Sequence, residues 1–168
     1  MARSTGRELA EHIRRNIKEL KKVCKGVDEN ISALSPEGRW SPKEILSHLL
    51  GQEGSGPSTT LQPILEQETP TIDMKPEDPF FTDERAGMTF AQLLAAVEEE
   101  YERLSRLTET LSGDQLDRTV RVPMLKDSPL SEYPTLEAWI AMLAGSKESH
   151  VKFHTDHMRE VLKDMVRN

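Results

Sequence analysis

Residues 40–50, WSPKEILSHLL, contain the clearest helix start in the chain. Ser41 and Glu44 can form a capping box, and the proline between them suits the first helical position. The glycines and prolines of residues 51–63 predict that any continuation of this helix toward residue 68 is kinked or broken. The segment therefore predicts a short, well-defined helix followed by irregular chain.

Three longer amphipathic segments lie on either side of this helix. Apolar residues recur at steps of three and four in residues 6–34, 89–111 and 135–166, which predicts one helix in each segment. The two long connections, residues 69–87 and 118–134, are rich in proline and show no regular period. Four amphipathic helices without a convincing pair of strands predict an all-α fold, a four-helix bundle.

The length and composition fit one domain over residues 1–168. A chain of 168 residues is the size of a single hydrophobic core. No apolar run approaches the ~20 residues that span a bilayer, and residues 1–16 lack a signal-peptide core, so we expect a cytoplasmic protein with no membrane partner. The single cysteine, Cys24, excludes an intramolecular disulfide and a cysteine-only metal site, and its place among the apolar residues predicts a core position.

The charge is acidic overall but unevenly distributed. The formal net charge is −7, whereas residues 1–25 carry eight Lys and Arg against three Glu. Binding to a phosphate backbone requires a basic field, so the acidic total argues against a nucleic-acid partner. The basic side of the first helix is either a solvated face or a contact for a small anion.

Two of the five histidines, His150 and His154, are four residues apart on the predicted last helix. This spacing places both rings on one side of the helix, where two nitrogens can converge on one divalent ion. Both lie on the seam that continues from Leu143 and Lys147, where core residues are expected. Burying two polar rings is costly without a ligand or hydrogen-bond partners, although a hydrated cavity without metal is an alternative.

A third histidine, His48, lies on the apolar side of residues 40–50. It can complete a set of three neutral ligands that leaves positions on the metal open, or it can be an ordinary core histidine. His157 is either a further ligand or a support for the ligands, and His12 is expected on the surface.

The chain resembles the DinB/YfiT-like four-helix bundles over about residues 5–166. The resemblance rests on WSPKEILSHL at 40–49, on Glu53, on LSGDQL at 111–116, and on PTLEAWI at 134–140 with the two histidines that follow. It implies an antiparallel four-helix bundle with a long crossover between the second and third helices. It also implies a homodimer, since members of the family are often dimeric.

The resemblance further implies a divalent metal held by His48, His150 and His154. Zinc or nickel is the usual occupant in such proteins, and iron and manganese also suit a three-histidine site. Members with assigned activities include thiol-dependent S-transferases and maleylpyruvate isomerases, while many members have no assigned activity.

The sequence departs from the family pattern in two places. Phe153 and Thr155 flank the last ligand, where the family often has a further histidine, and residues 51–57 replace the bulky residues that usually continue the second helix. Glu53 is a candidate hydrogen-bond partner of a metal-binding histidine, or a base. Five residues correspond to about 140° around a helix, so Glu53 faces away from His48 unless the glycines distort the turn. A solvated carboxylate is the alternative for Glu53.

The leading hypothesis is a divalent-metal-dependent thiol S-transferase or hydrolase that acts on a small electrophilic molecule. Any thiol would come from a low-molecular-weight cosubstrate, because Cys24 is expected in the core. The sequence assigns no catalytic side chain. The alternative is a dimeric bundle that binds metal or a small molecule without catalysis, and a third reading is a bundle without metal. Saturation of the ion by His157 or Glu53 would weaken the enzyme hypothesis.

Overall fold

The computed structural model describes residues 3–167, and the regular structure in this range is helical apart from three isolated β-bridges. The expected all-α class is confirmed. The helices, in which η1 and η2 are 3-10 helices and η3 is a π-helix, are α1 (Gly6–Cys24), α2 (Glu29–Ser32), α3 (Pro42–Leu50), η1 (Pro57–Thr60), α4 (Leu61–Glu66), α5 (Asp83–Ala86), α6 (Phe90–Glu109), α7 (Gly113–Leu116), η2 (Pro123–Leu125), α8 (Leu136–Ile140), η3 (Ala141–Gly145) and α9 (His150–Arg167).

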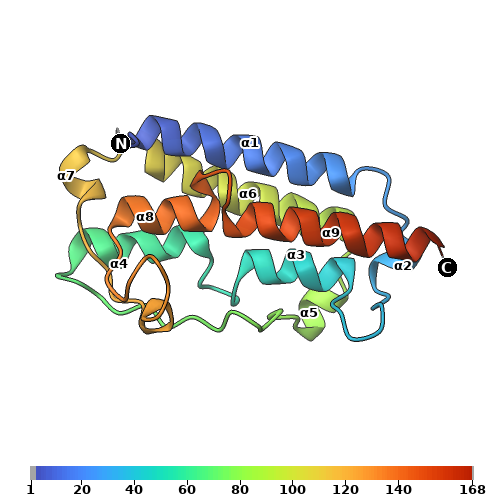
Figure 1. Cartoon of the computed structure of the whole chain (residues 1–168). Helices are drawn as coiled ribbons and strands as arrows, with labels where there is room; N and C mark the ends of the chain where they lie inside the picture. Colours follow the sequence, from blue (N-terminus) through green and yellow to red (C-terminus); the bar gives the residue numbers. More distant parts are fainter. Residues whose placement is uncertain (1–2, 168) are drawn as a thin grey trace.

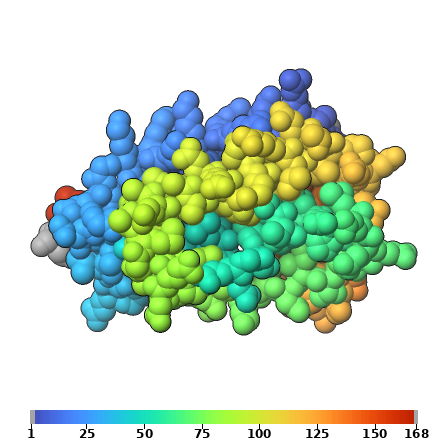
Figure 2. Space-filling model, turned by 180° about the vertical axis from the view of Figure 1, so that it is seen from behind, coloured from blue at the N-terminus to red at the C-terminus, as the bar shows by residue number. Residues whose placement is uncertain are grey.

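Four columns of helix pack side by side to form the bundle (Figure 1). The first column is α1, the second is α3 followed by η1 and α4, the third is α6, and the fourth is α8, η3 and α9. The first and fourth columns run in one direction and the second and third in the other. The second and third columns must therefore be joined by a connection along the whole bundle. Residues 67–82, with α5 after them, make that connection and confirm the long crossover, whose green atoms follow the lower edge of the molecule in Figure 2.

Reciprocal hydrogen bonds between two residues cap the starts of the main helices. The apolar faces of these helices pack together in one core. Ser41 Oγ accepts from the Glu44 backbone N–H, and the Glu44 carboxylate accepts from the Ser41 N–H, both at 3.1 Å. α1, α6 and α7 begin with the same arrangement. The largest fully buried side chains of the core are Trp139 and Tyr101. Within the described residues, no helix combines the length and apolar character needed to cross a membrane.

The first helix is shorter than the predicted span of residues 6–34. It ends at Cys24, and Gly26 adopts a φ of 75°. Glycine enters this left-handed region without steric cost, so the chain leaves the helix here. Asp28 then caps the separate helix α2, and Leu34 is 56% exposed instead of continuing the core stripe.

The predicted last helix, residues 135–166, is interrupted in its middle. α8 runs into the π-helix η3, and residues 146–149 leave the helical path before α9 begins at His150. Lys147, predicted on the apolar seam, is exposed because it lies in this interruption. The seam resumes only with α9, so the interruption sets the position of His150.

Asn16 of α1 stabilises the irregular residues 146–149 between η3 and α9. Its Nδ2 amide donates to the carbonyl oxygens of Ala144 at 2.7 Å and Ser146 at 2.8 Å, and it lies 3.2 Å from Ser149 Oγ. The Ser146 hydroxyl donates to the Ala141 carbonyl at 2.8 Å. These bonds satisfy carbonyl groups that the interruption removes from the helical ladder.

Gly6 lies where the start of α1 meets the end of α6. A Cβ atom on Gly6 would collide with the Thr108 carbonyl oxygen and lie 3.0 Å from that of Leu111. Backbone atoms cannot move aside as a flexible side chain can, so Gly6→Ala should lower the free energy of unfolding by about 2 kcal/mol, within the about 1–3 kcal/mol typical of overpacking. Urea denaturation measures this loss. The Gly113→Ala control, with no atom within 4 Å of the added Cβ, should be neutral or slightly stabilising. A Gly6→Ala protein as stable as Gly113→Ala would contradict the close approach of α1 and α6.

Candidate metal centre

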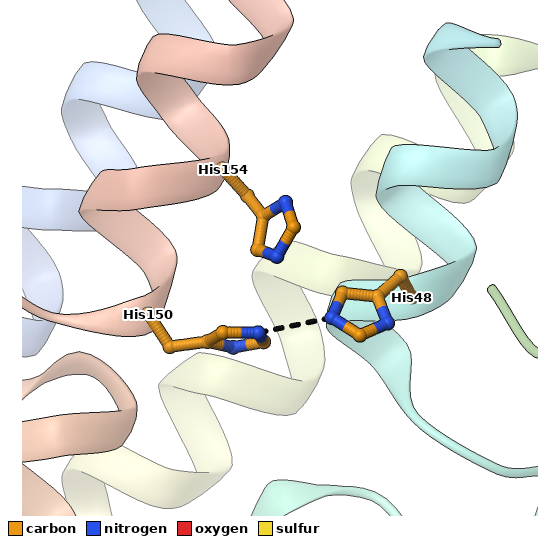
Figure 3. A group of neighbouring side chains, drawn as sticks. All are labelled: His48, His150 and His154. Carbon is orange, nitrogen blue, oxygen red and sulfur yellow. Dashed lines mark hydrogen bonds between the residues drawn. The ribbon is translucent and has the colours of Figure 1, made fainter. Parts of the chain in front are cut away.

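Three histidines from two columns of the bundle meet beside the interruption of the fourth column (Figure 3). His48 lies near the end of α3, whereas His150 and His154 lie on the first turns of α9. His48 and His154 are buried and His150 is half-buried. One ring nitrogen from each histidine lies within 4.8 Å of the other two, so the three side chains could hold one metal ion.

His48 is held in the tautomer that a metal ligand requires. Its Nδ1 lies 2.7 Å from the carbonyl oxygen of Asp78, which can only accept, so Nδ1 carries the proton and Nε2 keeps a lone pair. His48 Nε2 is 2.9 Å from His150 Nε2. Two ligands about 2.0–2.1 Å from one tetrahedral ion are about 3.3 Å apart, so the two rings could share a metal after moving apart by a few tenths of an ångström.

His154 presents one nitrogen to this pair and turns the other toward His157. His154 Nδ1 lies 3.4 Å from His157 Nδ1. Trp40 covers the same side of the cluster, with its ring stacked on His154 at a centroid distance of 6.0 Å and tilted against His48 at 4.8 Å. His157 therefore lies behind a possible ligand, and the indole limits the access of water to the two buried rings.

Burial keeps these imidazoles neutral. It lowers the pKa of His150 to about 4, with a further contribution from the nearby His48. The pKa of His154 is lowered further, chiefly by burial and then by His150. Burial also lowers the pKa of His48, although its hydrogen bond to the Asp78 carbonyl opposes the change. At neutral pH all three rings therefore offer lone pairs to a cation.

The sequence profile of the DinB superfamily matches residues 12–153. This chain belongs to the DinB superfamily. The solved structure of YfiT from Bacillus subtilis is similar to it, with a TM-score of 0.76 and 20% sequence identity over 99% of this chain and 90% of that chain. YfiT is described as a probable metal-dependent hydrolase with an unusual four-helix bundle topology. At this identity the likeness establishes the shared fold, and no curated protein matches the sequence significantly.

In this DinB-superfamily chain, hydrogen bonds hold the crossover against α3 beside the histidines. The buried Arg85 donates through Nη1 to the Ser47 carbonyl at 3.1 Å, the Ser47 hydroxyl at 3.0 Å and the Phe80 carbonyl at 3.1 Å. The Phe80 ring stacks on His48 with centroids 6.3 Å apart. These contacts hold the crossover, and with it the Asp78 carbonyl, against His48.

Glu53 contacts the crossover and is not part of the histidine cluster. Its exposed carboxylate accepts from the Thr82 hydroxyl at 2.7 Å and lies 3.9 Å from Arg85 Nε. Gly51, with a φ of 76°, ends α3 and turns the chain away from the helical path before Glu53 is reached. The contacts of Glu53 are therefore with the crossover, whose carbonyl at Asp78 contacts His48.

Two hollows meet at His150. The outer hollow, about 710 Å³ in volume, lies between Trp40, Pro76 and α9, and acidic side chains such as Glu160 line it. The second, which we call the apolar pocket, has a volume of about 330 Å³ and lies between α3, η1, the α8–η3 segment and residues 72–76 of the crossover. The crossover thus lines both spaces beside the candidate metal centre.

The histidines could be found from the sequence, but most of their surroundings could not. Trp40 was visible only as a residue preceding a helix, and nothing in the sequence indicates the carbonyl of Asp78 as a partner of His48.

Cys24 is buried at the end of α1, where burial raises the pKa of its thiol to about 12. His12 lies on α1 and is not a member of the three-histidine group.

Proposed function

We propose that this protein is a divalent-metal-dependent hydrolase of a small molecule, with the metal held by His48, His150 and His154. The observation that carries the proposal is the convergence of three neutral imidazoles within 4.8 Å beside two hollows. The description of YfiT as a probable metal-dependent hydrolase supports the same chemistry. Zinc or nickel is the proposed occupant, because both accept imidazole ligands readily.

The chain's own residues account for binding and orientation at this site. A divalent metal with three histidine ligands keeps a position open and lowers the pKa of bound water toward about 7. The Asp78 carbonyl fixes the tautomer of His48, while Trp40 and Phe80 pack on the rings and restrict water to the open side. The hollows provide room for a substrate at that side.

Thiol transfer to an electrophilic small molecule is the second candidate, and the pair of hollows favours it. Hydrolysis requires room for one organic substrate, whereas a transfer reaction requires room for a thiol and an electrophile. The outer hollow and the apolar pocket meet at His150 and could hold one reactant each. The thiol would be a low-molecular-weight cosubstrate, since Cys24 is buried and its pKa is raised to about 12.

Metal analysis and turnover test both candidates. Protein purified without a histidine tag should contain about one equivalent of zinc or nickel, and a strong chelator should remove it. We expect the metal-loaded protein to hydrolyse members of a panel of chromogenic esters and amides, and the chelated protein to do so only after metal is restored.

The metal-loaded protein could instead join a small thiol to a chloro-substituted fluorogenic electrophile, with release of chloride. This result would contradict the hydrolase proposal and support the transferase. Retained metal without turnover in either assay would leave a metal-binding bundle and contradict both enzyme proposals. A protein that neither contains nor binds zinc or nickel would overturn the metal centre itself.

A further inference from the structure

The apolar pocket and the outer hollow have Pro76 and His150 in common among their lining residues and otherwise differ. His48 and His150 line the apolar pocket, together with Trp139 and Tyr101. Its volume of about 330 Å³ is roughly twice that of a cavity of about 150 Å³ that accepts one benzene ring. The pocket is therefore large enough for a chain or ring system of moderate size next to the histidines.

The polar groups in the pocket wall are already used by the protein. The Trp139 indole N–H donates to Thr60 Oγ1 at 3.2 Å, and the Thr60 hydroxyl donates to the Pro57 carbonyl at 2.7 Å. The Tyr101 hydroxyl donates to the Leu49 carbonyl at 2.9 Å. A bound molecule consequently meets hydrocarbon and aromatic surface inside the pocket and finds few donors or acceptors.

Four further polar residues of the lining are exposed and so lie toward the solvent side of the pocket. Gln52, Ser55, Asp73 and Lys75 are all exposed, unlike the buried aromatic residues of the wall. The outer hollow has a different chemistry, since Arg39, Glu77, Asp156 and Glu160 are among its lining residues. The two spaces at the metal centre therefore differ in charge: four charged side chains line the outer hollow, whereas the two of the apolar pocket, Asp73 and Lys75, are exposed.

Methionines make the apolar pocket adaptable. Met74, Met124 and Met142 all line it, and the unbranched thioether side chain can fill irregular gaps around ligands of different shape. Met142 lies on the π-helix η3, a distortion that is frequent at functional sites. The wall can therefore adjust to several apolar groups and need not fit a single one.

We propose that the apolar pocket binds the hydrophobic part of the substrate, an alkyl chain or a one- or two-ring aromatic group, with tolerance for its shape. The inference rests on the proposed function, because the reacting group of the same molecule would lie at His150 beside the metal. A substrate of this class is amphipathic: its polar end faces the charged outer hollow and its apolar end enters the bundle.

A homologous series of alkyl hydroxamic acids tests the pocket in the metal-loaded protein. The hydroxamate group binds divalent metals, and the alkyl group is lengthened from methyl to heptyl. Calorimetry should show a Kd that falls about fourfold for each added methylene until the pocket is full. The 1-alkanols of the same lengths lack the chelating group and should bind more weakly, with the same dependence on length.

Two matched variants locate the binding. Met142→Gln keeps the size of the side chain but places an amide in the wall, and it should weaken the longest hydroxamate about tenfold. Met88→Gln changes a methionine that does not line the pocket and should leave the series unchanged. Because Trp139 lines the apolar pocket and Trp40 the outer hollow, 1-heptanol, which does not chelate the metal beside Trp40, should alter tryptophan fluorescence in Trp40→Phe protein and not in Trp139→Phe protein.

The outcomes separate this proposal from the proposed function. Hydroxamates that bind with the same Kd at every chain length would overturn the apolar pocket and leave the metal centre intact. Hydroxamates and alkanols that bind equally well, with the expected dependence on length, would support the pocket and contradict the metal centre. An equal effect of Met142→Gln and Met88→Gln would overturn the location of the binding.

Discussion

Replacing Asn16 by leucine should lower the free energy of unfolding by about 3 kcal/mol and weaken metal binding about tenfold. The Asn16 amide donates to the carbonyl oxygens of Ala144 and Ser146 at 2.7 and 2.8 Å. Leucine has a similar size but no donor, so two carbonyl groups in the interruption of the fourth column would lose their partner. Each buried polar group left unsatisfied costs about 1–3 kcal/mol.

The effect on metal binding follows from the position of Ser149. Its hydroxyl lies 3.2 Å from the Asn16 amide and accepts from the Lys152 backbone N–H at 3.2 Å, which caps the start of α9. His150 is the first residue of that helix. Loss of Asn16 would therefore release the turn that places His150 opposite His48.

Urea denaturation and metal titration measure the two effects in the same protein. Asn30→Leu is the matched control, because Asn30 is exposed on α2, and its stability should change by less than about 0.5 kcal/mol. If Asn16→Leu behaved like Asn30→Leu in both measurements, Asn16 would not hold the interruption together.

The bundle could be predicted because its determinants are local. The Ser41–Glu44 capping box and the proline between them start α3 as expected, and the apolar period of residues 89–111 corresponds to α6. The first helix was predicted too long because an apolar stripe continues past Gly26 in the sequence. The positive φ of that glycine, and not the stripe, decides where α1 ends.

The interruption of the fourth column could not be predicted because its partner is distant in sequence. Residues 135–166 have a helical period throughout, and no proline interrupts residues 141–150. What stabilises the irregular chain is Asn16, more than 120 residues away. A buried asparagine on an otherwise apolar face is the one signal that points to such a role, and it does not name its partner.

The candidate ligands were accessible to sequence reasoning because their spacing carries geometric information. His150 and His154 at four residues apart must share a helix face. The partners that orient them are backbone or aromatic groups from other segments: the Asp78 carbonyl on His48 and the Trp40 ring on His154. Such contacts depend on how the crossover packs, which no local pattern encodes.

Replacing His154 by alanine should weaken zinc or nickel binding by at least about 100-fold. A structural zinc site with four ligands binds with about 10–16 kcal/mol, so one ligand of several is worth about 3 kcal/mol, or more than a factor of one hundred. His157→Ala should weaken binding less, by about tenfold, because His157 contacts the ring of His154 at 3.4 Å and is not one of the three convergent nitrogens.

Competition with a chromophoric chelator measures both affinities, with His12→Ala as the control for loss of a histidine elsewhere in the bundle. His12 lies on α1, so its replacement should leave the affinity unchanged. Equal losses for His154→Ala and His157→Ala would make His157 a fourth ligand, fill an open position on the metal and weaken the enzyme proposals. An affinity unchanged in His154→Ala would place the metal outside the three-histidine cluster.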